Sequence, residues 1–255
     1  MPKVPPGPGT EGRNVTVTAA SMDGHVVLSM AGTLDAYTYR EVRDRIVKAA
    51  MDEPRSVIID ADSLVCLADS AWSVLTAARW LIYDWPGVPL SVVCRDESRR
   101  GVLRRGGICR YVPVFPDLQT ALGVQRPQRL RLRSRLALPA HPDSANLARV
   151  FVAMWLTRWE RPEMIIAAGI VVTELVENVL EHTSSQPRIR IETDGLTIVI
   201  AVEDDDPAPA RVRETPPGPA PMGLRIVGDL SLTWRSAPTA DGKVVWAALD
   251  TMKRI

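Results

Sequence analysis

The feature that most constrains the fold is a long apolar segment, residues 162–183, whose polar side chains recur every four residues. Residues four apart lie on one face of a helix, so this segment predicts an amphipathic helix. Its polar stripe holds Glu174, Asn178 and His182, and the apolar residues on the other side would pack against a sheet. A carboxylate, an amide and an imidazole on one face can orient a nucleophile and ligate a metal. A polar face that is merely solvated is the alternative.

The elements around this helix favour a layered domain. A helix opening at Asp143 or Ser144 and ending near residue 160 is predicted before it. After it, the predictions are strands 188–193 and 197–203, a loop over 205–221, a short helix from Met222-Gly223, and strands near 231–236 and 243–249. Asp194-Gly195 between the first two strands is typical of a hairpin turn. We therefore expect an α/β sandwich with helices on one face of a sheet.

The first half of the chain alternates between strand and helix patterns. Predicted strands are 15–20, 25–31, 56–61 and 90–94, and predicted helices are 35–51, 70–84, 96–105 and 117–122. Such alternation is typical of an α/β layer fold. With 255 residues in all, the chain is long enough for this domain and the sandwich together.

Five arginines and no acidic residue fall within residues 126–139, although the net charge of the chain is only +1. No aromatic residues lie among these arginines, so a solvated linker is favoured over a nucleic-acid contact. The alternation of Arg and Leu from Arg129 to Leu138 also suits an edge strand. We expect no direct binding of nucleic acid.

The cysteines and the N-terminus exclude several classes of protein. Cys66, Cys94 and Cys109 are widely spaced and odd in number, which argues against a zinc site or a disulfide framework. Cys66 and Cys94 lie in apolar runs and are interpreted as core residues. The Pro- and Gly-rich residues 1–13 lack the apolar core of a signal peptide and are expected to be disordered. Without a long apolar run, no membrane span is expected, and a cytoplasmic protein fits.

Three motifs in residues 14–125 resemble those of a STAS domain, the fold of anti-sigma-factor antagonists. They are Gly32-Thr33-Leu34-Asp35, the strand at 56–60, and the helix start at 67–71. The resemblance implies a mixed sheet with flanking helices. It also marks Asp69, Ser70 and Ala71 as the regulatory positions, at a surface that docks a partner.

The regulatory positions of this family form a phosphorylation switch. Members of the family carry a Ser in place of Ala71, and its phosphorylation breaks the complex by charge repulsion and desolvation. Ala71 has no hydroxyl, and Trp72 stands where the family has a small Gly. Ser70 is interpreted as a helix-capping residue. The resemblance thus implies a permanently unphosphorylated docking surface, with Trp72 altering which partner fits.

Residues 138–255 resemble a histidine-kinase-like ATPase domain of the anti-sigma-factor serine kinase branch. The matching motifs are 138–149 with 151–159, the N box at 173–178 with His182, the glycine boxes at 202–204 and 222–227, and the closing strand at 242–246. The resemblance implies a Bergerat-type α/β sandwich that binds ATP and Mg²⁺. Residues 126–137 would then be a linker or an edge strand of this domain.

The resemblance also implies a role for each motif residue. Asn178 would ligate Mg²⁺, Glu174 would take a proton from an attacking hydroxyl, and Asp204 would accept the amino group of adenine. His182 would contact phosphate or a partner, or else be a residue favoured at the end of a helix by the helix dipole. The remaining cofactor contacts implied are Asp206, Gly223, Leu224 and Arg225.

The glycine boxes depart from the family pattern. The first box of the family reads D-x-G-x-G, where this chain has Asp204-Asp205-Asp206-Pro207-Ala208. Its glycines let the backbone approach the nucleotide, and Asp206 adds a carboxylate nearby. Pro221 removes a backbone donor from the second box. Three arginines near these boxes could replace the lost phosphate contacts: Arg211, Arg213 and Arg225.

Three functional hypotheses follow. The first is an ATP-dependent serine/threonine kinase that acts on a separate antagonist protein in a sigma-factor partner-switching system. The second is a non-catalytic scaffold with a degenerate nucleotide site, which binds sigma-factor regulators. The third is an unrelated metabolic enzyme, which is disfavoured because the sequence contains no second constellation of catalytic residues. Expected partners are a sigma factor, separate antagonist or anti-sigma proteins, the chain's own first domain through an intramolecular contact and, from the resemblance alone, a second copy in a homodimer.

Overall fold

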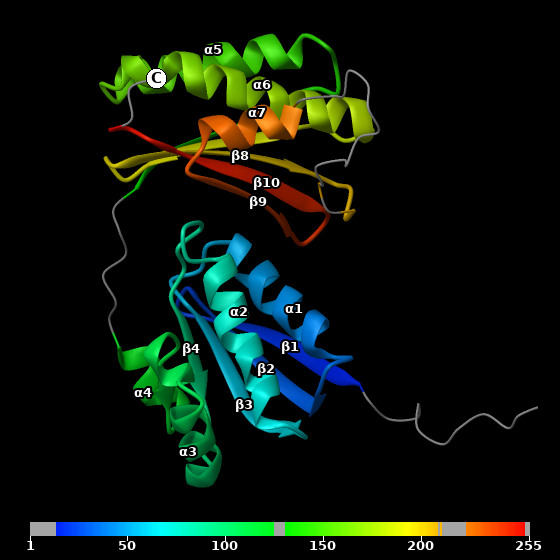
Figure 1. Cartoon of the computed structure of the whole chain (residues 1–255), viewed down its shortest axis with the longest axis vertical. Coiled ribbons are helices and arrows are strands. Elements are labelled where there is room, and N and C mark those ends of the chain that lie inside the picture. The colour runs from blue at the N-terminus through cyan, green and yellow to red at the C-terminus, as the bar shows by residue number, and fades with distance from the viewer. Residues whose placement is uncertain (1–13, 125–130, 209, 211–222, 253–255) are drawn as a thin grey trace, which may run out of the picture. The chain divides into compact units, whose positions relative to one another are not determined.

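The computed structural model describes residues 14–124, 131–208, 210 and 223–252. The chain divides into two compact units, Met1–Arg126 and Pro127–Ile255, and each has its own five-stranded sheet (Figure 1). Three predictions concern residues outside the described parts of the chain: the disordered segment 1–13, the start of the Arg-rich linker, and most of the Pro-rich loop before Gly223.

The first unit is built on a mixed sheet with strand order β1-β2-β3-β4-β5. β1 is antiparallel to β2, and the other neighbouring strands are parallel. The strands are β1 (Val15–Met22), β2 (His25–Leu34), β3 (Val57–Cys66), β4 (Leu90–Val93) and β5 (Val114–Phe115). The helices are α1 (Tyr39–Met51), α2 (Ser73–Leu81), α3 (Glu97–Arg105) and α4 (Leu118–Gly123), with 3₁₀ turns η1 (Asp69–Trp72) and η2 (Ile108–Arg110). The prediction of a mixed sheet with flanking helices is confirmed.

Glycines have a conformational role at two positions of the first unit. Asp23 and Gly24 join β1 to β2 with φ angles of 49° and 82°, the left-handed pair that suits a two-residue hairpin turn. Gly32 has a φ of 114°, and a Cβ built there would lie 2.1 Å from the carbonyl oxygen of Asn14. A glycine is therefore required at the start of the Gly32-Thr33-Leu34-Asp35 motif, for steric and conformational reasons.

Aspartate side chains cap two of the helices of the first unit. Asp96 Oδ1 accepts hydrogen bonds from the backbone N–H groups of Ser98 (2.8 Å) and Arg99 (3.2 Å) at the start of α3. Asp117 accepts from the N–H of Thr120 (2.7 Å) at the start of α4. Such bonds satisfy N–H groups that have no partner within the helix. Both predicted helix starts are confirmed.

The predicted end of the third strand and the interpretation of one cysteine need correction. The strand predicted over 56–61 runs on to Cys66, because alternation continues past the polar residues: Leu64 is buried, whereas Val65 is 55% exposed. Cys66 lies at the end of this strand, partly exposed, and its thiol donates to the carbonyl oxygen of Ala68 (3.0 Å). The interpretation of Cys66 as a core residue is therefore wrong, whereas Cys94 is buried as predicted.

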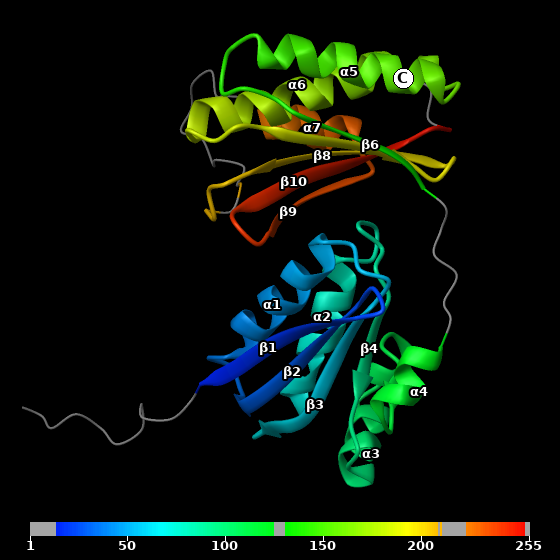
Figure 2. The same cartoon turned by 180° about the vertical axis from the view of Figure 1, so that it is seen from behind.

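The second unit is an antiparallel sheet with α5, α6 and α7 on one face (Figures 1 and 2). Its strand order is β6-β7-β8-β10-β9. The strands are β6 (Leu132–Ala137), β7 (Arg188–Thr193), β8 (Thr197–Asp204), β9 (Thr233–Pro238) and β10 (Lys243–Asp250). The helices are α5 (Ser144–Arg158), α6 (Ile165–His182) and α7 (Gly223–Leu230), with a 3₁₀ turn η3 (Pro162–Met164) directly before α6.

Part of the Arg-rich segment belongs to this sheet. β6 is an outer strand that pairs antiparallel with β7, and Leu136 packs against the core while Leu132 is 58% exposed. Glu192 of β7 is buried between two cations, with Arg131 Nη1 and Arg190 Nε lying 3.3 and 3.0 Å from its carboxylate oxygens. The alternative of an edge strand thus describes residues 132–137.

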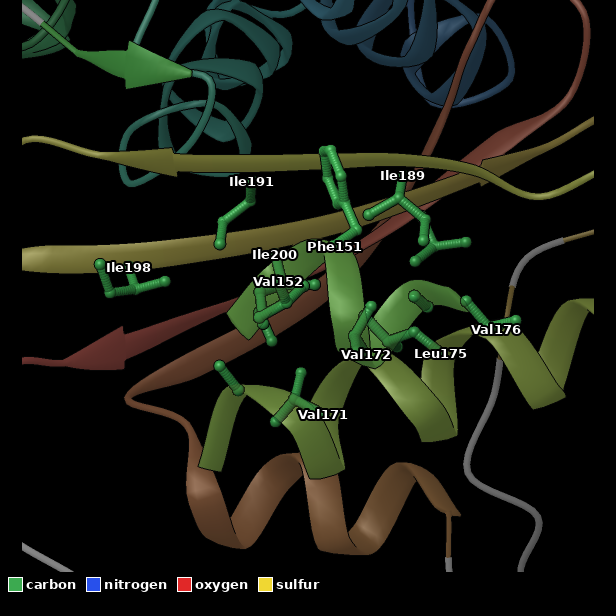
Figure 3. Packing of buried hydrophobic residues seen from close by; sticks show 14 of the residues in the cluster. Phe151, Val152, Val171, Val172, Leu175, Val176, Ile189, Ile191, Ile198 and Ile200 are labelled. Atoms are coloured by element: carbon green, nitrogen blue, oxygen red, sulfur yellow. The ribbon is translucent and has the colours of Figure 1, made fainter. Parts of the chain in front are cut away.

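The core of the second unit lies between the helices and the sheet (Figure 3). Apolar residues alternate along β7 and β8 and therefore share one face of the sheet. The facing side chains come from Phe151 and Val152 of α5, Val171, Val172, Leu175 and Val176 of α6, and Ile189, Ile191, Ile198 and Ile200 of the strands. This packing fixes the rotation of α6 and leaves Glu174 and Asn178 off the buried stripe.

Candidate functional site

Glu174 lies on α6 beside the first residue of α7. A Cβ at Gly223 would be 2.8 Å from Glu174 Oε2, so the glycine is what allows the carboxylate to approach the start of α7 this closely. Burial, followed by the charges of Glu177 and Glu181, raises the pKa of Glu174 above its usual value. A carboxyl group with a raised pKa is a stronger proton acceptor once it is ionised.

Asn178 and His182 continue the stripe on α6 toward its C-terminal end. Asn178 is partly buried one turn beyond Glu174, while His182 is exposed and is the last residue of the helix. A basic residue at this position interacts favourably with the helix dipole. The structure thus brings Glu174 and Asn178 to one face of α6, and it leaves His182 exposed at the C-terminal end of the helix.

Asp204 ends β8 on the face of the sheet that the helices cover. Its side chain is fully buried. Oδ1 accepts from the ammonium of Lys243 (2.9 Å) and from the N–H of Asp206 (2.8 Å). Oδ2 is also buried, and it accepts no hydrogen bond from the described residues. Since buried polar atoms nearly always have a hydrogen-bond partner, this oxygen is a candidate acceptor for a donor from outside the described residues.

Lys243 is a buried residue whose contact with Asp204 sequence reasoning missed. It begins β10, lies opposite Asp204 in the strand register, and is only 4% exposed. Its ammonium also donates to the backbone oxygen of Asp206 (3.1 Å) and lies 3.4 Å from Asp206 Oδ2. The N–H of Ala208, and more weakly Lys243, lower the pKa of Asp206. The available signal was a lysine at the head of an otherwise apolar strand, 243–249.

Gly242 makes this arrangement sterically feasible. A Cβ at position 242 would lie 2.0 Å from the carbonyl oxygen of Asp204 and 2.6 Å from Cα of Asp205. Since real Cβ atoms do not approach backbone this closely, only glycine lets β10 start directly beside the end of β8. The position of Lys243 against Asp204 follows from that register.

The remaining predicted contacts lie around α7. Leu224 is partly buried and packs against the core of the second unit, whereas Arg225 is exposed. The other predicted phosphate contacts, Arg211 and Arg213, lie outside the described residues, as does Pro221. Around α7, the described residues that remain as candidates for contacting a ligand are therefore Gly223 and Arg225.

A groove of about 530 Å³ runs between α5 and α6. Its walls are apolar apart from Arg149, Thr173 and Glu174. Arg149 Nη1 donates to Thr173 Oγ1 (3.1 Å), which ties the two helices together at the groove. Glu174 therefore borders this groove as well as the start of α7, while Asn178 and Asp204 are not among its lining residues.

The regulatory positions of the first unit lie on the 3₁₀ turn η1. Asp69 and Ser70 are exposed, and Ala71 is partly buried, with its N–H donating to Ala68 O (2.9 Å). Ala68, not Ser70, occupies the cap position of this turn, so the interpretation of Ser70 as a cap is wrong. Trp72 is buried, and its effect on the choice of partner stays a prediction.

The described parts of the chain contain neither a membrane-spanning helix nor a cluster of metal-binding side chains. None of the helices there is both long and apolar enough to cross a membrane. Nor do residues 14–124, 131–208, 210 and 223–252 contain a group of three or more His, Cys, Asp or Glu side chains placed to hold a metal ion.

Comparison with known proteins identifies the family that the first unit resembles. Residues 16–121 match the STAS domain family. The anti-sigma-F factor antagonist RsfB of Mycobacterium tuberculosis is 28% identical over 109 residues, which are 43% of this chain and 88% of that relative. A solved anti-sigma factor antagonist from Mycobacterium paratuberculosis is 24% identical, with a TM-score of 0.38, over 43% of this chain and 92% of that one. The RsbU and RsbW domains of a Mycobacterium tuberculosis protein are 18% identical, with a TM-score of 0.36, over 47% of this chain and 32% of that one.

Proposed function

We propose that this chain, whose residues 16–121 form a STAS domain of the anti-sigma-factor antagonist type, is a regulator in a sigma-factor partner-switching system. The relative with 28% identity is named as an anti-sigma-F factor antagonist, which supports an anti-sigma factor or its kinase as the partner. The docking surface is the exposed turn with Asp69 and Ser70. Because Ala71 has no hydroxyl, phosphorylation at that position does not release the partner.

The second unit, in this proposal, is a Bergerat-type ATPase domain of the anti-sigma-factor serine kinase branch. Its antiparallel sheet covered on one face by helices is compatible with that fold. The single observation that carries the nucleotide site is Asp204 Oδ2, a buried acceptor without a donor among the described residues. The amino group of adenine is a donor that fits it, and Glu174 and Asn178 supply oxygen atoms on the facing helix stripe.

The proposed reaction is transfer of a phosphoryl group to a serine of a separate antagonist protein. ATP held at Asp204 would supply the phosphoryl group and would leave as ADP, and Mg²⁺ would neutralise the charge that develops during the transfer. Glu174 would take the proton of the attacking hydroxyl, and the Asn178 amide oxygen would ligate Mg²⁺. Gly223 offers the free N–H groups at the start of α7 to phosphate, while Arg225 and His182 are exposed contacts for phosphate or partner.

A specific observation favours the second candidate, a non-catalytic scaffold. The loop after Asp204 lacks both glycines of the first box, and Lys243 already occupies one oxygen of Asp204. In that case the second unit binds sigma-factor regulators without turning over ATP. The homodimer, the cytoplasmic location and the intramolecular contact between the units stay predictions under both candidates.

Thermal unfolding of the full chain with Mg²⁺ and ATP tests the nucleotide site. Ligand at 100 times its dissociation constant should add about 2.7 kcal/mol to the free energy of unfolding. We expect a rise in melting temperature that Asn178→Ala abolishes. Asn146→Ala on α5 is the matched control, since Asn146 is an exposed asparagine outside the proposed site. An unchanged melting temperature for the wild-type chain would favour the scaffold.

A further inference from the structure

We infer that Lys243 masks the base-recognition carboxylate of the second unit, so that a purine binds only after the Lys243 ammonium leaves Asp204. The inference rests on the proposed function, because it concerns the base site of the proposed ATPase domain. It assigns to this chain's own lysine the control of access to that site.

Both oxygens of Asp204 are closed to a ligand in this arrangement. An ionised carboxylate oxygen accepts about two hydrogen bonds, and Oδ1 already accepts two, from Lys243 Nζ and from the N–H of Asp206. Oδ2 has no donor among the described residues, but it is buried. One oxygen is therefore saturated and the other is out of reach, so adenine can donate to Asp204 only after a side chain moves.

All the N–H donors of the Lys243 ammonium are already directed at protein acceptors, so none is left for a ligand. An ammonium has three N–H bonds, and three acceptors surround this one: Asp204 Oδ1 (2.9 Å), Asp206 O (3.1 Å) and Asp206 Oδ2 (3.4 Å). The ammonium thus acts as a built-in competitor, a donor already bound to the carboxylate to which the amino group of a purine would donate.

Asp206 gives the displaced lysine an alternative position. The side chain of Asp206 is 36% exposed, whereas those of Asp204 and Lys243 are 0% and 5% exposed. The ammonium can keep its partner Asp206 while it moves away from Asp204, so unmasking does not leave a buried cation without a counter-charge. Asp206 thereby acquires a role as the second site for the Lys243 ammonium.

The test is titration of the full chain with a fluorescent ATP analogue, followed by competition with ATP and with GTP. Lys243→Thr removes the ammonium and leaves room beside Asp204. We expect it to bind the analogue at least about tenfold more tightly, because a competent state populated at about 10% or less lowers the apparent affinity by that fraction. Arg235→Thr on β9 is the control, since Arg235 is an exposed cation of the same sheet.

A second variant guards against misfolding, because Lys243→Thr leaves a buried carboxylate without a counter-charge. The double variant K243T/D204N keeps an acceptor oxygen at position 204 without that charge, and it should also bind more tightly than the wild type. If the wild type bound the analogue as tightly as both variants do, the inference that Lys243 masks Asp204 would be wrong, and the proposed function would be unaffected. Equal tightening by Arg235→Thr would overturn the mask as a general charge effect. Absence of binding in all four proteins would overturn the mask and the nucleotide site together.

Discussion

At the scale of single residues, Glu174 has a pKa that its surroundings raise. It is partly buried and shares one side of α6 with Glu177 and Glu181, and both burial and these charges disfavour its ionised form. The folded chain therefore holds the Glu174 proton more tightly than the unfolded chain does. Ionisation of this residue lowers the stability of the fold, and a general base at this position loses activity as the pH falls through its raised pKa.

Replacement of Glu174 by Gln should expose this effect as a dependence on pH. Stability from the raised pKa is present below the usual value of 4.5 and is lost as the pH rises through the folded-state pKa. The variant has no such loss. The free energy of unfolding of the variant minus that of the wild type should therefore increase between about pH 4 and pH 7. Urea unfolding at both pH values measures this, with the exposed Glu163→Gln as control. A gain that reverses with rising pH would contradict the argument.

Residues differ in how far the sequence alone could place them. Glu174 and Asn178 share a helix stripe, and spacing within one helix was enough to predict that. Lys243 and Asp204 lie 39 residues apart, and their ion pair depends on the register between β8 and β10. No local pattern encodes that register, because it depends on pairing with a backbone segment distant in sequence, whose close approach Gly242 permits. The site could thus be predicted as a set of motif residues but not as a set of contacts.

At the scale of elements, strongly periodic segments were predictable and their ends were not. The helical segment predicted over 162–183 is found as η3 and α6, Pro162–His182, because its apolar stripe persists over its whole length. β3 extends to Cys66 through polar residues, since pairing with β2 supplies backbone hydrogen bonds whatever the side chains are. α1 begins at Tyr39 and not near Asp35, because Asp35 Oδ1 holds a turn by accepting from the N–H groups of Tyr37 and Thr38.

Two glycines of the second unit should respond to alanine in opposite directions. Gly169 lies inside α6, and a Cβ there would meet nothing within 4 Å, so Gly169→Ala should stabilise the fold by about 0.5–1 kcal/mol. Gly242→Ala places a Cβ against backbone and should destabilise it by about 1–3 kcal/mol or more. Urea unfolding midpoints measure both changes, and each variant serves as the other's control. Destabilisation by Gly169→Ala would mean that the helix needs a glycine for another reason.

At the scale of the whole molecule, two separate sheets are joined by one short connection. The sequence predicted two domains that bind each other, and a short tether gives them an effective concentration of roughly millimolar. In the proposed function, such a contact would hold the second unit away from a sigma factor. The α/β classes of the units were predictable from the order of elements, whereas a contact between them depends on surfaces that no periodicity describes.

Cutting the connection should therefore increase capture of the sigma factor. A protease site introduced within residues 126–129 lets the first unit be released after the full chain has folded. We expect more sigma factor in a pull-down with the cut protein than with the uncut one. Cleavage at a site introduced near residue 13 is the control, because it leaves the two units joined. Equal capture before and after the cut would count against an inhibitory contact.

The two outer strands of the second sheet carry a consequence for solubility. An open sheet can recruit strands from neighbouring molecules along its edges and so grow into aggregates. β6 presents Arg133 and Arg135 on one edge, and β9 carries Arg235 and ends at Pro238 on the other. Charges and prolines at such positions oppose edge-to-edge polymerisation. The arginines of β6 are thus placed to oppose fibrous self-association, to which the edges of an open sheet are prone.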